Sequence, residues 1–185
     1  MKKKLFFLTL GIISLQSSYA QNNVFKASLL SPIVSTYSFF YERALGSSGV
    51  TVNPGFFYTV LRSDGFQYNG FCITPSFRYY YPGFGRNEDG IGGIYADVFF
   101  RYQQIDATKL SSSSQAILYS TNAGILVGWH IIFAKHISLD FFLGPTLFIS
   151  KYVKAKSGIN TTSEFNYNLF TNYNYRGGIT LGFAF

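Results

Sequence analysis

The sequence predicts an all-β fold, an eight-stranded antiparallel up-and-down β-barrel that spans a membrane. Three observations predict it: an N-terminal export signal, a composition rich in aromatic and poor in charged residues, and apolar residues that alternate with small or polar ones. Alternation with a period of two is the pattern of a β-strand whose two faces meet different surroundings.

The N-terminus has the three parts of a secretory signal peptide. Lysines at positions 2–4 precede an apolar stretch over residues 5–15, and a small-residue cleavage site ends at Ala20. A retained membrane anchor is the alternative, but the apolar stretch is about half of the ~20 residues that a spanning helix needs. We therefore predict that residues 1–20 are a cleaved signal peptide and that residues 21–185 form one barrel domain.

The composition excludes several classes of protein. Aromatic residues make up 20% of the chain and charged residues 12%, against about 25% charged residues in typical globular chains. Removal of residues 1–20 lowers the formal net charge from +7 to +4, too small and dispersed a charge to indicate a nucleic-acid partner. Cys72 is the only cysteine, so no intramolecular disulfide is possible, and no Cys and His spacing indicates a metal or cofactor.

A closed barrel is the remaining route into a membrane. After the signal peptide no apolar run approaches the length of a spanning helix. In lipid every backbone polar group must find a partner within the protein, and a closed barrel achieves this without helices.

The first three strand segments are the weakest. Residues 24–30 are short and end before Pro32. Residues 36–45 and 49–62 alternate aromatic or aliphatic side chains with small or polar ones, which predicts strands with one apolar face.

The five later segments alternate more regularly. Residues 69–82, 92–105 and 117–133 each place an apolar face opposite a smaller or more polar one. Residues 136–152 and 173–185 repeat the pattern, and the last segment shows it best. Within 117–133 the alternation puts Ile125 and Val127 on the lipid face and Gly124 and Gly128 on the lumen face.

The predicted connections start from an N-terminus in the periplasm. Short periplasmic turns and longer outer loops are expected of such barrels. The first outer loop is short and the middle turn is long, so the match is partial. The predicted turns are 46–48, 83–91 and 134–135, and the predicted outer loops are 31–35, 63–68, 106–116 and 153–172.

A soluble barrel with an apolar interior would also alternate. Three features favour the lipid-facing version. The polar face is rich in Gly, Ser, Thr and Ala and poor in Lys and Glu, aromatic residues cluster near strand ends, and Phe185 closes an alternating strand. Aromatic girdles at both interfaces are typical of membrane barrels. The girdle candidates are Tyr37, Tyr119, Trp129, Phe133, Tyr173, Phe183 and Phe185.

The signal peptide, the alternation and the final Gly182-Phe183-Ala184-Phe185 resemble the small outer-membrane β-barrels, typified by outer membrane protein X and the transmembrane domain of outer membrane protein A. The resemblance implies location in the outer membrane of a Gram-negative bacterium, with outer-membrane lipid and lipopolysaccharide as surroundings. It also implies that Phe183 and Phe185 act as the signal that the barrel assembly machinery recognises.

Six charged residues fall on the lumen face, and their formal charges sum to zero. Buried charges tend to pair because an isolated charge in a low-dielectric interior is costly. We therefore predict a lumen charge network that plugs the barrel. A gated proton or ion path is the alternative, although an eight-stranded interior is only wide enough for side chains to fill it. The six residues are Glu42, Arg78, Asp97, Arg101, Asp140 and Arg176.

Three further features have both a structural and a chemical interpretation. His130 and His136 flank a predicted turn, and we interpret them as turn-flanking polar residues rather than metal or acid–base groups. His136 and Ser138 with Asp140 could suggest a hydrolase, but the predicted topology puts them at the periplasmic end. Cys72 is predicted to be a small lumen-facing residue.

The predicted function is a non-enzymatic surface barrel that supports envelope integrity or presents loops to a surface partner. A narrow channel or transporter and an outer-membrane lipid-modifying enzyme are the alternatives. Lys151, Lys154 and Lys156 open the longest outer loop and could contact lipopolysaccharide phosphates, or they could belong to an ordinary solvated loop.

Overall fold

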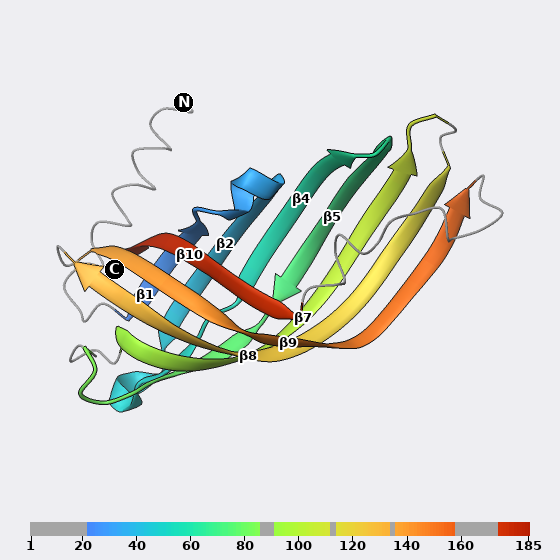
Figure 1. Cartoon of the computed structure of the whole chain (residues 1–185). Helices are drawn as coiled ribbons and strands as arrows, with labels where there is room; N and C mark the ends of the chain where they lie inside the picture. Colours follow the sequence, from blue (N-terminus) through green and yellow to red (C-terminus); the bar gives the residue numbers. More distant parts are fainter. Residues whose placement is uncertain (1–21, 86–90, 112–113, 134–135, 158–173) are drawn as a thin grey trace, which may run out of the picture.

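The computed structural model describes residues 22–85, 91–111, 114–133, 136–157 and 174–185 (Figure 1). Residues 1–20, predicted to be the signal peptide, lie outside this part. Ten strands and two short 3-10 helices, η1 (Ser31–Val34) and η2 (Gly46–Ser48), form nearly all of it. The strands are β1 (Asn23–Ser28), β2 (Thr36–Ala44), β3 (Val50–Val52), β4 (Gly55–Ser63), β5 (Phe66–Thr74), β6 (Ser76–Tyr80), β7 (Gly93–Lys109), β8 (Gln115–Phe133), β9 (Ile137–Ser157) and β10 (Tyr175–Ala184).

The antiparallel pairings form a closed ring with eight positions, because β1 pairs with both β2 and β10. β3 and β4 are parts of one predicted strand and β5 and β6 parts of the next, with Pro54 and Pro75 at the breaks. Proline has no N–H for the ladder, but its carbonyl oxygen can still accept a hydrogen bond. Pro54 O accepts from Tyr41 N at 3.0 Å and Pro75 O from Phe100 N at 3.1 Å. The predicted eight-stranded barrel is confirmed, with two strands interrupted at a proline.

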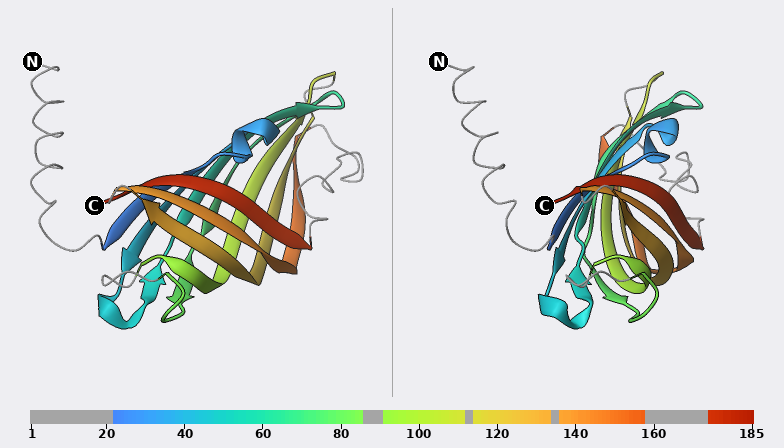
Figure 2. Two further views of the ribbon diagram at one scale, coloured as in Figure 1. Left: turned by 60° about the vertical axis from the view of Figure 1, so that its left-hand side comes forward. Right: turned by 90° about the vertical axis from the view of Figure 1, so that its left-hand side faces the viewer.

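The two ends of the barrel differ in how far the wall closes. We call the end where β1 begins and β10 ends the turn end, and the opposite end the loop end. The β1–β10 seam runs from Val24 opposite Ala184 to Ser28 opposite Thr180, so it lies in the turn-end half. β7, β8 and β9 are the longest strands and extend towards the loop end well past the start of β10 (Figure 2).

Three predicted outer loops are shorter than the sequence suggested. β9 runs to Ser157, so it takes up residues 153–157 of the predicted loop 153–172, and residues 158–172 lie outside the described part of the chain. Residues 66–68 belong to β5, so the predicted loop 63–68 is wrong; Asp64 and Gly65 alone make the turn, with φ of 52° and 77°. A two-residue type I′ hairpin needs positive φ at both positions, which Asp-Gly supplies. The predicted loop 106–116 contracts in the same way, since β7 runs to Lys109 and β8 starts at Gln115.

The exterior is apolar and the interior polar, as the alternation predicts. Val127 is 61% exposed and Ile125 55%, whereas a Cβ on Gly128 would lie 2.4 Å from the Tyr95 ring inside the barrel. Ile94, Val98 and Phe100 on β7 are exposed in the same way. This arrangement excludes a soluble barrel with an apolar interior and fits a barrel in lipid. In the described residues, no helix has the length and apolar character needed to span a membrane.

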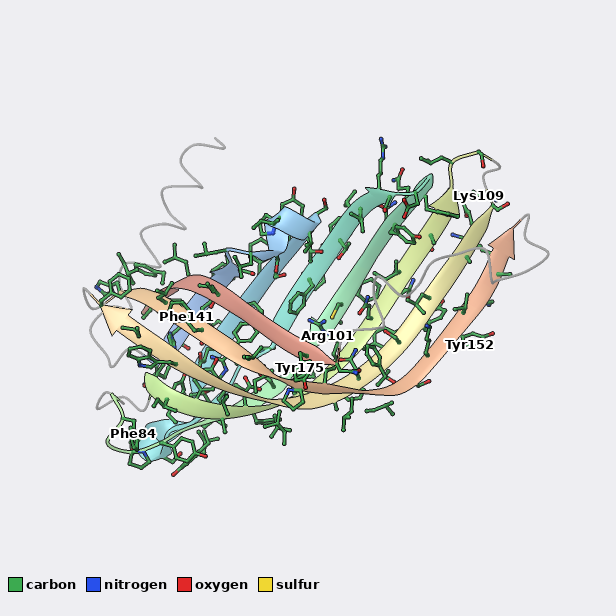
Figure 3. The ribbon with its side chains drawn as sticks, in the orientation of Figure 1. Phe84, Arg101, Lys109, Phe141, Tyr152 and Tyr175 are labelled. Carbon is green, nitrogen blue, oxygen red and sulfur yellow. The ribbon has the colours of Figure 1, made fainter. Side chains whose placement is uncertain are left out.

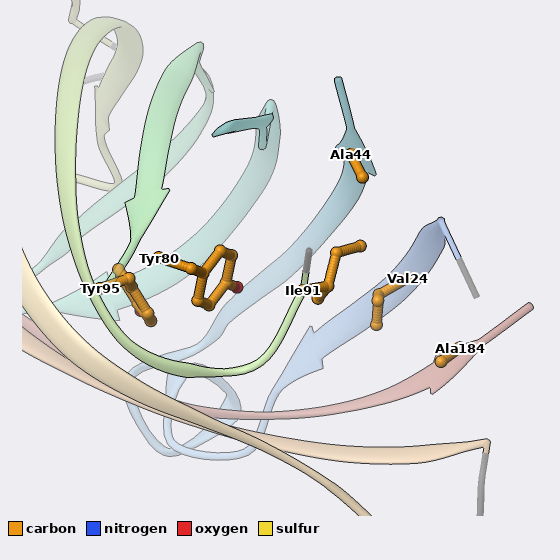
Figure 4. Packing of buried hydrophobic residues seen from close by; sticks show 6 residues of the cluster. All are labelled: Val24, Ala44, Tyr80, Ile91, Tyr95 and Ala184. Atoms are coloured by element: carbon orange, nitrogen blue, oxygen red, sulfur yellow. The ribbon is translucent and has the colours of Figure 1, made fainter. Parts of the chain in front are cut away.

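An apolar cluster fills the turn end of the lumen. Tyr80 and Tyr95 contribute the large side chains, and Ile91 reaches into the same space from the segment before β7 (Figure 4). All six members are buried, which closes this end of the barrel with side chains. The cluster comprises Val24, Ala44, Tyr80, Ile91, Tyr95 and Ala184.

Candidate functional site

A layer of paired charges lies next to the apolar cluster in the turn-end half of the lumen. It contains two cations and three carboxylates from five strands, each almost completely buried. We call it the ion-pair layer; its members are Lys26 on β1, Glu42 on β2, Arg78 on β6, Asp97 on β7 and Asp140 on β9. The antiparallel register puts Arg78 directly opposite Asp97, and side-chain contacts join Lys26, Glu42 and Asp140 to this pair.

Each cation contacts more than one carboxylate. Lys26 Nζ lies 2.5 Å from Glu42 Oε2 and 3.0 Å from Asp140 Oδ2. Arg78 donates through Nε to Asp97 Oδ2 at 2.6 Å and through Nη1 to Asp140 at 2.7 Å and Glu42 at 3.2 Å. The Arg78 guanidinium also lies 4.2 Å from the centre of the Tyr95 ring. The layer is therefore a connected network and not a set of isolated pairs.

Hydroxyl groups complete the coordination of the carboxylates. Thr51 and Tyr80 both donate to Glu42 Oε1 at 2.7 Å, and Tyr95 donates to Asp140 Oδ1 at 2.6 Å. Removal of one partner from a buried, hydrogen-bonded ion pair leaves an uncompensated buried charge and lowers the stability of the fold by about 3–5 kcal/mol. The layer is thus a rigid obstacle across the lumen.

His130 belongs to this network, so its interpretation as a turn-flanking residue is wrong. Its Nδ1 lies 2.7 Å from the Tyr80 hydroxyl and 3.7 Å from Glu42 Oε2, and the side chain is buried. Since Tyr80 donates its proton to Glu42, His130 Nδ1 donates to the Tyr80 oxygen. No carboxylate lies near His130 in the sequence; the one beside it in the structure, Glu42, belongs to β2, whereas His130 belongs to β8.

Arg101 and Arg176 lie apart from the ion-pair layer, so the six predicted charges do not form one network. Arg101 donates through Nε to Thr74 Oγ1 at 3.2 Å, and its guanidinium lies 4.6 Å from the centre of the Phe57 ring. Arg176 lies 4.7 Å from the centre of the Phe99 ring and 5.4 Å from that of Phe57. Across the described residues, neither guanidinium has a carboxylate within 4.0 Å.

These two arginines line a cavity of about 380 Å³ in the loop-end half of the lumen. Arg101 lies among the side chains that face the space enclosed by the strands (Figure 3). Phe40, Phe57 and Phe142 supply apolar walls, and Ser31 and Thr36 polar ones. A second cavity of about 600 Å³ adjoins it and shares Thr36, Phe57 and Arg101. We call the first one the arginine cavity.

The predicted lysine cluster is divided between the two faces of β9. Lys154 is directly opposite Ile117, and Lys156 lies 3.8 Å from Asp106. Lys151 is directly opposite Ser120, a buried lumen-face residue. Residues directly opposite in an antiparallel pair point to the same side, so the structure brings Lys154 and Lys156 together on the outer face and leaves Lys151 on the inner one.

The terminal aromatic residues lie on the seam at the turn end. Phe183 is directly opposite Phe25, half-exposed, and stacked between His136 and Phe185. The backbone of Phe185 exchanges two hydrogen bonds with Asn23, at 3.1 and 2.9 Å. The last residue therefore takes part in the closure of the barrel.

Of the remaining predicted residues, Cys72 and His136 have structural partners and the Ser138 hydroxyl has none in the described part of the chain. Cys72 is buried beside Phe40 and Phe57, and its Sγ lies 3.5 Å from Thr74 Oγ1. His136 Nδ1 lies 3.0 Å from the Ala184 carbonyl oxygen, whereas Ser138 is buried and its hydroxyl has no hydrogen-bond partner among the described residues. Among the described residues, no cluster of three His, Cys, Asp or Glu side chains could hold a metal ion.

Sequence reasoning missed Lys26, which no predicted network included. The signal was present: Val24, Lys26 and Ser28 alternate with Phe25 and Ala27, which places the lysine on the lumen face of a short strand.

Comparisons with known proteins agree with this architecture. The profile of a family described as "Protein of unknown function (DUF3575)" matches residues 5–167. The N-terminal β-barrel domain of Pseudomonas aeruginosa OprF is similar over 90% of this chain and 100% of its own, with a TM-score of 0.55 and 15% identity. Neisserial surface protein A is similar over 88% of this chain and 94% of its own, with a TM-score of 0.48 and 12% identity. No protein with a curated description matches the sequence significantly. The prediction of a small outer-membrane β-barrel is confirmed.

Proposed function

The chain belongs to the DUF3575 family, and on that premise we propose that it is an outer-membrane barrel that binds a ligand or partner at its loop end, without forming a through-channel and without catalysing a reaction. One observation carries the proposal: the lumen is blocked in its turn-end half and hollow in its loop-end half.

The block has two consecutive parts. The apolar cluster closes the turn end, and the ion-pair layer crosses the lumen behind it. A solute would have to displace both. Opening the layer means separating Arg78 from Asp97 and Asp140 at 2.6 and 2.7 Å, which is costly in a low-dielectric interior. A barrel built in this way favours binding over conduction.

The arrangement of Ser138 and His136 supports a non-enzymatic role. A nucleophilic serine needs a base within hydrogen-bond reach of its hydroxyl. Ser138 Oγ has no hydrogen-bond partner among the described residues, while the ring nitrogen of His136 that bonds is directed at the Ala184 carbonyl. Asp140, the acid of the suggested triad, is occupied by Lys26, Arg78 and Tyr95.

We also propose that Lys154 and Lys156 contact phosphate groups of lipopolysaccharide. Both are exposed on the outer face of β9 near the loop end, where the sequence-based orientation puts the outer leaflet. The attraction is between exposed charges and is therefore sensitive to salt.

Conductance across a planar bilayer tests the proposal. The purified full-length mature chain should insert without producing stepwise current, while a general porin in the same membrane serves as the positive control. Liposome swelling in small sugars should likewise match protein-free vesicles. Reproducible current steps from heat-modifiable, folded protein would establish the channel function instead. Changed lipid A mass spectra in cells that express the protein would establish the enzymatic one.

A further inference from the structure

We propose that the arginine cavity binds an anionic amphiphile, a molecule with one carboxylate or phosphate headgroup and a single acyl chain that leaves sideways into the membrane. The inference deepens the proposed binding function by naming the class of ligand. It rests on the charge of the cavity, its unpartnered polar groups and its connection to the lipid-facing surface.

The charge of the cavity calls for an anion. A guanidinium has five N–H donors. In the described residues the Arg101 guanidinium uses one of them for Thr74, and the Arg176 guanidinium donates no hydrogen bond. Both instead lie over the ring of Phe57. Two cations that share one partly buried cavity repel each other, and an anion between them would relieve that repulsion while accepting paired hydrogen bonds from each.

Two further polar groups point to a ligand rather than to packing. Asn122 and Thr146 both line the arginine cavity. Asn122 Oδ1 and Thr146 Oγ1 are buried without a hydrogen-bond partner among the described residues. Buried polar atoms in native proteins are nearly always paired, so unpaired ones beside two arginines mark a place where a polar headgroup can be held.

The wall of the cavity is thin on one side. β1 ends at Ser28, opposite Thr180, and Leu29 N donates to Ile179 O at 2.9 Å. Residues 175–178 of β10 therefore pair only with β9 within the described part of the chain. Figure 2 shows β10 curving away from the β1–β2 side of the barrel over this stretch.

An apolar groove on the lipid-facing side begins at the same place. Leu30, Phe142, Gly177 and Gly178 line both the groove and the arginine cavity. At the two glycines the barrel wall carries no side chain. A larger residue would not fit at either position, because a Cβ on Gly177 would lie 2.9 Å from Leu143 and one on Gly178 would lie 2.6 Å from the Phe142 ring.

The groove continues over exposed apolar side chains of β7, β8 and β9. Ile94, Val127, Trp129 and Leu143 line it. A headgroup at the arginines would thus place its acyl chain on a surface that is apolar and directed at lipid. A soluble inorganic anion would satisfy the arginines but leave this groove without a role, so the geometry favours a membrane-borne amphiphile.

The single tryptophan allows a direct test, because Trp129 lines the groove. The mature chain is reconstituted in phosphatidylcholine nanodiscs and titrated with dodecyl phosphate or with dodecanoate, each brominated on its alkyl chain. Bromine quenches the fluorescence of a nearby tryptophan, so the fluorescence of Trp129 reports the position of the chain. Wild type should show saturable quenching at low mole fraction. Arg101→Gln with Arg176→Gln should weaken the apparent affinity about tenfold or more, the loss expected for charge-assisted hydrogen bonds. Arg62→Gln, which removes an exposed arginine, is the matched control and should bind as wild type.

Brominated dodecanol carries the same chain without the charge and should quench only weakly and without saturation. Heat-modifiable migration verifies that each variant is folded, and the two single arginine variants serve if the double variant does not fold. Equal quenching by the alcohol, or equal affinity in the arginine variants, would overturn the proposal. Complete displacement by inorganic phosphate at the same concentration as dodecyl phosphate would also overturn it in favour of a soluble anion. None of these outcomes depends on conductance, so failure here is distinguishable from failure of the proposed closed barrel.

Discussion

In the turn-end half of the lumen, Lys26 and Arg78 each contact two or more carboxylates, whereas in the loop-end half Arg101 and Arg176 lie against aromatic rings. The first half is filled and internally compensated, and the second contains a cavity with uncompensated positive charge. Charges that stabilise a barrel meet their partners within the chain, while charges without such partners indicate a ligand from outside. The barrel wall also differs between the two halves. The β1–β10 pairing that closes the wall lies in the turn-end half.

The largest expected effect concerns the ion-pair layer. Asp140→Asn removes one of the two carboxylates that Lys26 and Arg78 share and should destabilise the barrel by about 3–5 kcal/mol, the cost of breaking a buried ion pair. The same substitution at Asp106, which has only an exposed contact with Lys156, should cost about 1 kcal/mol or less. Urea unfolding in detergent micelles, followed by heat-modifiable migration, gives both values. Equal costs at the two positions would remove the distinction between a compensated interior and the surface.

The next effect fixes where the membrane lies relative to the two halves. Val127→Arg puts a charge on the lipid face and should cost about 2–4 kcal/mol if the site is near the bilayer midplane. Tyr152→Arg, on the exposed loop-end extension of β9, should cost about 0–1 kcal/mol because it lies near or beyond the interface. Unfolding in lipid bilayers measures the difference. A neutral Val127→Arg would mean that this face does not meet lipid.

A smaller effect is expected at the seam. Phe185→Ala removes the terminal aromatic side chain at the end where β1 and β10 close the ring, and should lower the amount of folded protein in the outer membrane several-fold. Tyr175→Ala, at the opposite end of β10, should leave it unchanged because Tyr175 is exposed and far from the seam. Quantitative immunoblots of outer-membrane fractions provide the measurement. Equal levels for Phe185→Ala and wild type would argue against the assembly role.

The smallest effect concerns the exposed lysines. Lys154→Gln with Lys156→Gln should weaken binding to lipopolysaccharide vesicles about twofold at low salt and have no effect at high salt, because exposed charges are screened. Lys151→Gln, on the inner face, is the control and should bind as wild type. Vesicle flotation at two salt concentrations measures this. A salt-independent loss, or an equal loss from Lys151→Gln, would contradict the assignment of faces.

The strands were predictable because lipid outside and polar side chains inside impose a strict period of two. Ile125, Val127, Gly124 and Gly128 accordingly lie on the predicted faces. The sequence also contains a hairpin signal in Asp64-Gly65, although the predicted loop 63–68 is longer than this two-residue turn. Local patterns of this kind depend on a few neighbouring residues and can be recognised without a structure.

The composition of the site was not predictable to the same extent, because it depends on register between distant strands. His130 has no carboxylate near it in sequence, yet it is directly opposite Asp140 and lies beside Glu42. Arg101 and Arg176 share the lumen face with Arg78 and differ from it only in their level along the barrel. Alternation assigns a face, but the level at which two charges meet follows from the pairing of whole strands.

Access of water to the two halves tests the central claim most directly. In a Cys72→Ser background, Thr36→Cys places a thiol on the wall of both loop-end cavities, and Ser138→Cys places one in the buried turn-end half. A membrane-impermeant maleimide applied to folded protein in proteoliposomes should label the cysteine at position 36. It should label the cysteine at position 138 only after denaturation. Labelling of both positions at similar rates in the folded barrel would contradict a lumen that is closed at one end and open at the other.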